Sequence, residues 1–337
     1  MTTADHPPSD FAQLIALTRI SPSHFRSVAQ PFRPGAARGV FGGHLLAQSL
    51  YAASLTVPLR SGLVCNSLQA QFLAANTDAV PFNYHVDNVR DGGTYRIRQV
   101  RVYQNLDPDN PDHETYVYTC FVSFKYIEGL HDPVYYAASQ VHGNKWGHIP
   151  APPPVNHIVP DNLPSVPDID LPMWVAWASD PDSGFVQIKH AVDVRRAPEQ
   201  DPATIPDNFE DRRMYHSYKT ILPLPDDDPN MHLAAHIYAS DRNSLFTSSR
   251  LINRVDDINR VVSLSHTIIF YPPSKPSRGL FVRADKSWNT MESWTTRSGD
   301  GRLSYVGRMY DDEGEMFAEF MQDGLCKFGD LPPKTKL

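Results

Sequence analysis

The sequence predicts an α+β protein of two tandem modules, each with a helix followed by a curled antiparallel sheet. Three observations lead to this prediction. The chain has 337 residues, enough for two ordinary domains. The predicted elements occur in the same order in both halves, and a proline-rich stretch separates them. We predict an N-terminal module over residues 1–145, a linker over 146–175 and a C-terminal module over 176–337.

The N-terminal half contains one long amphipathic segment followed by four segments typical of strands. Residues 43–57 place apolar side chains at helical spacing along one face, and Pro58 ends the predicted helix. A shorter helical pattern precedes it at residues 11–17. The later segments are rich in β-branched and aromatic residues, which favours strands at residues 67–74, 82–89, 95–104 and 114–126.

The C-terminal half repeats this order after the linker, in which eight prolines lie between residues 150 and 172. A helix is predicted from Ser240 and Asp241 to about Leu251. The segments after it predict a strand at residues 263–271, two shorter strands within 280–297, and a hairpin of 301–310 and 315–328. The common order of elements indicates two fused copies of one domain.

One acidic residue distinguishes the two predicted copies. The sequence VFGGH at residues 40–44 leads into the N-terminal helix without an acid. The sequence IYASD at residues 237–241 instead places Asp241 at the predicted start of the C-terminal helix. An aspartate at a helix start is ordinarily an N-cap, so only its companions favour a catalytic role. This asymmetry predicts that the chemistry resides in the second copy.

Composition and missing motifs exclude several classes of function. The formal net charge is −7 and no basic stripe is present, which argues against a nucleic-acid partner. Cys65, Cys120 and Cys326 are too widely spaced for a zinc or redox motif. The nucleophile elbow, the phosphate-binding loop, the dinucleotide fingerprint and the zinc-protease motif are all missing. We therefore expect neither a metal nor a cofactor.

The chain carries weak signals for location. No apolar run approaches the ~20 residues that a membrane-spanning helix needs, so we expect no membrane span. The N-terminus shows no basic region followed by an apolar one, which argues against a secretory signal. The chain ends in Thr335, Lys336 and Leu337, one residue away from the peroxisomal address Ser-Lys-Leu. We expect a peroxisomal or a cytoplasmic location.

Five short motifs, in order along the chain, resemble the signature of the acyl-CoA thioesterase II family. They lie at residues 40–53, 90–100, 238–241, 263–267 and 322–324. The resemblance spans roughly residues 30–128 and 230–328. This sequence departs from the family at three motif positions: it has His44 where Gln is usual, Ser263 where Thr is usual, and Ser265 where Asp is usual.

The resemblance implies a double hotdog fold, in which each curved antiparallel sheet wraps around a long central helix. It also implies a catalytic set of Asp, a hydroxyl residue and Gln that together hold a water molecule. These positions fall on Asp241, Ser263 and Gln322. Association of double hotdog units into a homo-oligomer is a further implication of the resemblance.

The motifs also contain residues that we expect to contact an acyl-CoA substrate. The glycine turn lets a ligand approach the backbone closely, and backbone N–H groups at a helix start can polarise a carbonyl group. The expected substrate-binding residues are Gly42, Gly43, His44, His266 and Thr267. Each also has a plain structural reading, as a packing glycine, a core histidine or a strand hydroxyl.

The chemistry of a thioester suits this residue set. A thioester carbonyl is more electrophilic than that of an oxygen ester, and thiolate is a good leaving group, so a positioned water molecule suffices as nucleophile. A carboxylate can act as general base, while a hydroxyl and an amide align the water. For Asp241 to act as a base near neutral pH, its surroundings must desolvate it.

Two alternatives to acyl-CoA hydrolysis remain open. Residues 241–245 approach the Asp-x-Asn-Pro-Leu-His motif of double hotdog enoyl-CoA hydratases, but Phe246 occupies the position of the decisive histidine. The other alternative is an acyl-thioester-binding protein that lacks turnover or serves one biosynthetic intermediate. Ser265 and His44, which depart from the family pattern, favour that alternative.

Overall fold

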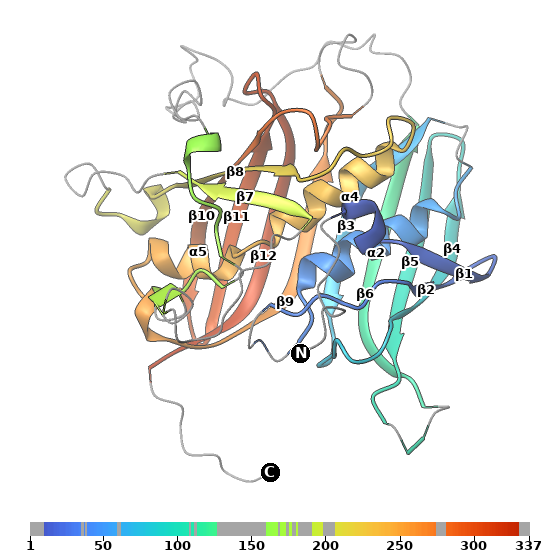
Figure 1. The fold of residues 1–337 in the computed structure, drawn as a ribbon, viewed down its shortest axis with the longest axis horizontal. Coiled ribbons are helices and arrows are strands. Elements are labelled where there is room, and N and C mark those ends of the chain that lie inside the picture. The colour runs from blue at the N-terminus through green and yellow to red at the C-terminus, as the bar shows by residue number, and fades with distance from the viewer. Residues whose placement is uncertain are drawn as a thin grey trace.

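The computed structural model shows a twelve-stranded antiparallel sheet with its helices on one face (Figure 1). Two similar halves of the sheet meet at β3 (Leu63–Phe72) and β9 (Ile258–Phe270). All statements on structure concern the residues that it describes. These are residues 10–34, 37, 39–58, 62–107, 109–110, 113–126, 160–167, 169–172, 175–176, 180, 191–197, 206–273 and 281–329.

The order of strands in one half mirrors that in the other. The N-terminal half runs β1-β2-β4-β5-β6-β3 and the C-terminal half runs β9-β12-β11-β10-β8-β7. The remaining strands are β1 (Leu17–Ser21), β2 (His24–Ser27), β4 (Asn83–Asp91), β5 (Tyr95–Gln104), β6 (Thr115–Tyr126), β7 (Val192–Arg196), β8 (Met214–Thr220), β10 (Asn289–Gly299), β11 (Arg302–Tyr310) and β12 (Met316–Phe328).

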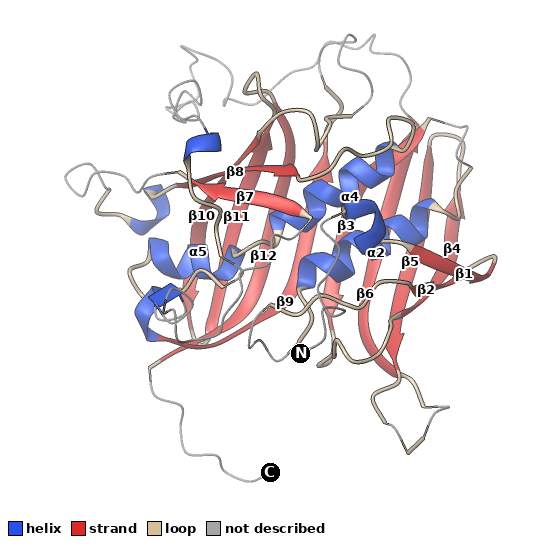
Figure 2. Ribbon diagram, viewed as in Figure 1, coloured by secondary structure: helices blue, strands red, loops and turns tan. Residues whose placement is uncertain are grey.

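Two long helices, one from each half, lie side by side and antiparallel against the middle of the sheet (Figure 2). They are α2 (Gly42–Ser54) and α4 (Pro229–Ser240). The start of α2 meets the end of α4, and Tyr51 near the end of α2 hydrogen-bonds Asp228, the N-cap of α4. Shorter helices are α1 (Phe11–Leu14), α5 (Ser244–Leu251) and three 3-10 turns at Pro160–Asn162, Phe209–Asp211 and Val255–Asp257.

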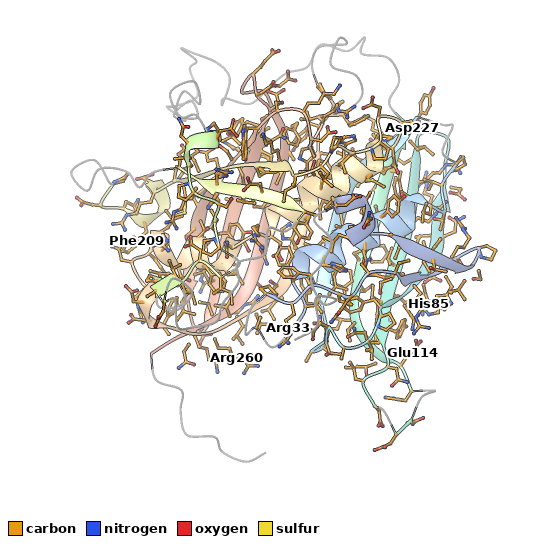
Figure 3. All side chains as sticks on the ribbon, viewed as in Figure 1. Arg33, His85, Glu114, Phe209, Asp227 and Arg260 are labelled. Atoms are coloured by element: carbon orange, nitrogen blue, oxygen red, sulfur yellow. The ribbon has the colours of Figure 1, made fainter. Side chains whose placement is uncertain are left out.

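The hydrophobic core lies between the two central helices and the sheet, where the buried apolar side chains form one cluster. Figure 3 shows the side chains of the described residues on the ribbon. Leu46 and Leu50 of α2, Ile237 of α4, and Val122 and Ile268 of the sheet are all fully buried. Burying such side chains contributes on the order of 2 kcal/mol each to folding. The arrangement of two central helices and two curved half-sheets confirms the predicted double hotdog fold.

The start predicted for the C-terminal helix, at Ser240 and Asp241, is wrong. Asp241 ends α4 as its C-cap residue, and a separate helix, α5, begins three residues later. The start of α4 carries an ordinary signal that the prediction overlooked, since the Asp228 side chain accepts a hydrogen bond from the Met231 N–H and Pro229 follows as the first helical residue. Residues 40–44 and 237–241, which were predicted to be equivalent turns, are therefore the start of α2 and the end of α4.

Strand prediction was accurate for β5, β6 and the last hairpin, placed β3 and β9 with starts four and five residues too late, and failed at the edges of the sheet. The hairpin at β11 and β12 and the strands β5 and β6 lie within a residue of their predicted bounds. Two short strands were predicted within residues 280–297, but a single strand, β10, occupies the end of this range. The short strands β1, β2, β7 and β8, which extend the sheet at its two edges, were not predicted.

Part of the proline-rich segment that was predicted to be a linker lies against the edge strand β7. The Val166 N–H donates to the carbonyl of Val194 at 2.7 Å, and Ser165 forms a β-bridge with Arg195. The division of the chain at residues 145 and 175 stays a prediction, because residues 127–159 lie outside the described ranges.

Candidate active site

The candidate site lies where the start of α2 meets the end of α4. Phe41, the N-cap residue of α2, makes no capping bond with its side chain. The carboxylate of Asp241 takes this role from the other half of the chain, because the Gly43 N–H donates to it. A carboxylate at a helix N-terminus is favoured by the aligned peptide dipoles. Asp241 therefore joins the two halves electrostatically.

The two glycines of the sequence motif are needed for this close approach. A Cβ atom on Gly42 would lie 2.7 Å from a carboxylate oxygen of Asp241. A Cβ atom on Gly43 would lie 2.8 Å from the backbone carbonyl of Tyr238, well inside normal contact distance. The helix ends can meet only because both positions lack a side chain.

The amide of Gln322 is the centre of the hydrogen-bond network around Asp241. Its Nε2 donates to Asp241 Oδ1 and to Ser263 Oγ, both at 2.7 Å. Its Oε1 accepts from the hydroxyls of Ser244 and Tyr305, both at 2.8 Å. The amide thus uses both of its donors and both acceptor positions, which fixes its orientation. Because the oxygens of Asp241 and Ser263 both lie 2.7 Å from the same nitrogen, a water molecule with bonds of about 2.8 Å can span them.

Strand register brings three of the buried polar residues together. Tyr305 on β11, Gln322 on β12 and His266 on β9 are directly opposite one another across neighbouring strands. Their side chains therefore share the face of the sheet that packs against the helices. All three are fully or almost fully buried.

Ser263 reaches this face through a β-bulge. Ser265 pairs with Asp323, whereas Ser263 pairs with the next residue, Gly324, so Leu264 is the extra residue of the bulge. In a regular strand, Ser263 would face away from Gln322, because side chains alternate between faces. The bulge re-aims the hydroxyl toward the amide, a common role of bulges near functional sites.

The N-terminal half has the same bulge without the polar residues. The register of β3 shifts between Cys65 and Ser67, as that of β9 shifts around Leu264. Cys65 of β3 corresponds to Ser263 of β9. Leu68 corresponds to His266, and their partners on the neighbouring strands, Val122 and Gln322, correspond to each other. The equivalent place in the first half therefore carries a thiol and an apolar side chain, and the polar network belongs to the second half alone.

Burial shifts the acidity of Asp241 into the neutral range. The residue is only 6% exposed, and this desolvation raises the pKa of its carboxyl from 3.8 to about 7. Hydrogen bonds from Gln322 and Gly43 oppose the shift, because they favour the ionised form. A carboxyl with this pKa is partly ionised near neutral pH and can both accept and return a proton.

Two family models match the chain. The first, described as the acyl-CoA thioesterase N-terminal domain, matches residues 29–124, and the second, described as the acyl-CoA thioesterase C-terminal domain, matches residues 160–326. Together they cover more than half of the chain. The chain belongs to the acyl-CoA thioesterase family. This membership confirms the predicted family and the prediction of a thioester hydrolase.

Similar proteins match the thioesterase over different shares of their length. Acyl-coenzyme A thioesterase 8 of Mus musculus is 22% identical over 314 residues, which cover 88% of this chain and 83% of the mouse protein. Peroxisomal acyl-coenzyme A thioester hydrolase 1 of Saccharomyces cerevisiae is 30% identical over 124 residues. That match covers 37% of this chain and 33% of the yeast protein, so the chain aligns with about a third of that relative.

The fold of the thioesterase resembles that of a solved bacterial structure. The acyl-CoA thioesterase II TesB2 from Mycobacterium marinum superposes with a TM-score of 0.65 and is 24% identical. The superposition covers 94% of this chain and 98% of the other. At this level of identity, the likeness supports the double hotdog architecture alone.

The structure brings Gly42, Gly43 and His266 to the Asp241 network. His266 Nε2 lies 2.9 Å from Ser240 Oγ, which itself donates to the Ile237 carbonyl at 2.7 Å. Ser240 has one hydroxyl hydrogen, so Nε2 carries the proton in this bond and Nδ1 does not. Burial lowers the pKa of His266 to about 4, and the ring is therefore neutral.

His44 and Thr267 lie apart from this network. His44 is buried in the first turn of α2 and faces Phe82 of the N-terminal half, with ring centroids 6.4 Å apart. Thr267 alternates with His266, so its side chain lies on the opposite face of the sheet, where its strand partners Gln69 and Met321 are exposed. Contact of these two residues with substrate stays a prediction, and we leave both out of the proposed site.

Sequence reasoning missed Ser244 and Tyr305, the two hydroxyl donors to Gln322. Ser244 is the first residue of α5 and follows the Asp241 motif, so its closeness to the acid was the available signal. Tyr305 belongs to none of the five motifs, and only its strand register with Gln322 identifies it.

The described residues hold no metal-binding cluster of three or more His, Cys, Asp or Glu side chains. In the same part of the chain, no helix is long and apolar enough to pass through a membrane.

The raised pKa of Asp241 makes a prediction about stability. The folded protein holds this proton up to about pH 7, whereas the unfolded chain releases it near 3.8, so the contribution to stability is present at low pH and lost as pH rises through 7. From pH 5 to pH 8, the unfolding free energy of wild type should fall relative to that of Asp241→Asn by about 2 to 3 kcal/mol. Urea unfolding of both proteins at each pH measures this difference.

Asp285→Asn supplies a control of opposite sign. Burial raises the pKa of Asp285, but hydrogen bonds from Arg283 and Leu224 outweigh it and leave the pKa below its ordinary value. Wild type should therefore gain stability over Asp285→Asn as pH rises from acidic values. If the wild-type and Asp241→Asn curves stay parallel between pH 5 and pH 8, the pKa of Asp241 is not raised.

Proposed function

We propose that the thioesterase hydrolyses acyl-CoA with a water molecule that is activated in the site of Asp241, Ser263 and Gln322. The observation that supports this assignment is the Gln322 amide, which bonds the acid and the hydroxyl at 2.7 Å each. Asp241 is the only one of the three that can take a proton from water. Ser263 gives the water its second contact, and Gln322, whose own donors and acceptors are all used, fixes the acid and the hydroxyl relative to each other.

In the proposed reaction, Asp241 removes a proton from water as the water oxygen attacks the thioester carbonyl carbon. The tetrahedral intermediate collapses with cleavage of the carbon–sulfur bond, and the proton on Asp241 passes to the departing thiolate. The products are a carboxylic acid and CoA, and no covalent enzyme intermediate forms. A base with a pKa of about 7 can perform both transfers at neutral pH.

The start of α2 supplies the electrostatic environment for the developing oxyanion. Gly43 N–H bonds Asp241, and His44 N–H bonds the Phe41 carbonyl at 3.1 Å. We assign the remaining amide of this turn, Gly42 N–H, as the donor to the substrate carbonyl oxygen. The positive end of the helix dipole favours negative charge at the same place.

The geometry favours hydrolysis over the two alternatives. Hydration of an enoyl thioester would need a histidine paired with Asp241; within the described residues the acid bonds no imidazole, and His266 bonds Ser240 instead. The departures that suggested a protein without turnover lie away from the network. Ser265 faces the outer side of the sheet beside Asp323, and His44 faces the N-terminal half.

We also propose acyl-CoA, rather than another acyl carrier, as the substrate, and the peroxisome as the place of action. The names of the mouse and yeast relatives support the substrate, and that of the yeast relative supports the location. The C-terminal residues Thr335, Lys336 and Leu337 lie outside the described ranges. A homo-oligomer of double hotdog units stays a prediction.

Asp241→Asn tests the proposed base. Removing a positioned general base typically lowers a rate by about 10²- to 10⁴-fold, and we expect a loss of kcat in this range with KM little changed. In wild type, kcat should rise with pH through a midpoint near 7, since only ionised Asp241 accepts the proton. Release of free thiol from acyl-CoAs of several chain lengths measures both effects. Wild-type turnover in Asp241→Asn would reject the assignment.

Ser263→Ala and Ser265→Ala form a matched pair on one strand. The bulge at Leu264 turns Ser263 toward Gln322, whereas Ser265 faces outward. We expect Ser263→Ala to lower kcat by about 10-fold or more, because the water loses one of its contacts, and Ser265→Ala to leave kcat unchanged. Equal kcat values for the two variants in the thiol assay would remove Ser263 from the site.

A further inference from the structure

A segment of the proline-rich linker contacts the turn that carries Asp241. This turn joins α4 to α5 and contains Asn243, whose backbone has the left-handed conformation, with φ 56° and ψ 18°. Few residues other than glycine adopt this conformation, and asparagine is among those that do. Asn243 lies between Asp241 and Ser244, both of which bond Gln322.

Both polar atoms of the Asn243 side chain bond the linker backbone. Its Nδ2 donates to the Pro167 carbonyl at 2.8 Å, and its Oδ1 accepts from the Asp170 N–H at 3.2 Å. We call linker residues 165–167 and 169–170 the strap. The side-chain amide of Asn243 therefore pairs with the strap through one donor and one acceptor, as a backbone peptide group does in a sheet.

The strap is in turn fixed to two elements of the C-terminal half. The buried carboxylate of Asp170 forms ion pairs with Arg196 of β7 and Arg250 of α5, and Arg250 also donates to the Asp170 carbonyl at 3.2 Å. The Asp170 side chain is only 5% exposed, whereas those of Arg196 and Arg250 are 27% and 18% exposed, so the carboxylate is the shielded member of both pairs. Ser165 adds a hydroxyl bond of 2.6 Å to Asp193 of the same edge strand.

We infer that Asn243 and Asp170 are positioning residues, through which the strap holds the α4–α5 turn so that Asp241 and Ser244 face Gln322. The inference rests on the proposed function of Asp241. Neither residue touches the proposed water, so each acts through the turn. A turn held at both ends keeps the acid within the sub-ångström tolerance that catalysis demands. The strap thus takes part in the site by holding this turn.

Asn243→Ala and Asn243→Gly test the inference together. Alanine removes both strap bonds and disfavours the left-handed backbone, whereas glycine removes the bonds and keeps the backbone conformation. We expect both variants to lose kcat by about 10- to 100-fold with little change in KM. A loosened turn admits water to the acid, so the acidic limb of the kcat–pH profile should also move to lower pH in both.

Asn253→Ala is the matched control. Asn253 follows α5 at its other end, has the same left-handed backbone with φ 57°, and is exposed. Its substitution should leave both kcat and the pH profile of wild type unchanged. Asp170→Asn keeps the N–H that bonds Asn243 but weakens the ion pairs, so we expect a smaller loss of kcat in the same direction. This variant carries the test if Asn243→Ala does not fold.

Two results would overturn the inference. One is wild-type kcat in Asn243→Gly, which would show that only the backbone conformation matters. The other is a lower melting temperature in the folded Asn243 and Asp170 variants with an unchanged kcat and pH profile, as a purely structural role predicts. A wrong assignment of the base gives a different result: Asp241→Asn then keeps wild-type turnover, whatever the strap variants do.

Discussion

The contact between the Asp241 carboxylate and the start of α2 connects the two halves of this thioesterase. It requires two helices from different halves to meet end to start, and Gly42 and Gly43 leave the space for that approach. The same contact withdraws the carboxylate from water, which raises its pKa, and provides amide donors, which limit the increase. Stability and chemistry therefore depend on the same few atoms, as is common where a site is kept in an unfavourable ionisation state.

The duplicated scaffold explains how the site is built from ordinary parts. Both halves have a central helix, the same strand order and a bulge at the same place in the strand next to the junction. The bulge re-aims one residue in each half, Cys65 in the first and Ser263 in the second. Only the second half adds the amide and the acid. The first half contributes the helix start, and it carries Cys65 and Val122 where the second half has Ser263 and Gln322.

The sequence predicted the parts of the fold that have strong periodic patterns. Helix α2, the strands β5 and β6 and the last hairpin were close to their observed bounds, whereas β3 and β9 begin four and five residues before their predicted starts. The motifs identified Asp241, Ser263 and Gln322. Helix α4 was missed because its buried residues lie on all sides, between α2 and the sheet, and leave no polar face to detect. Tyr305 and the strap were missed because their contacts depend on tertiary register and on a segment without regular structure.

The ionisation of Asp241 can be measured directly by ¹³C NMR of protein labelled at its aspartate carboxyl carbons, in wild type and Asp241→Asn between pH 4 and pH 9. We expect one carboxyl signal that is absent from the variant and titrates in wild type with a midpoint of about 7. If the signal lost in the variant titrates near the ordinary value of 3.8, Asp241 is a conventional helix cap and cannot be the proposed base.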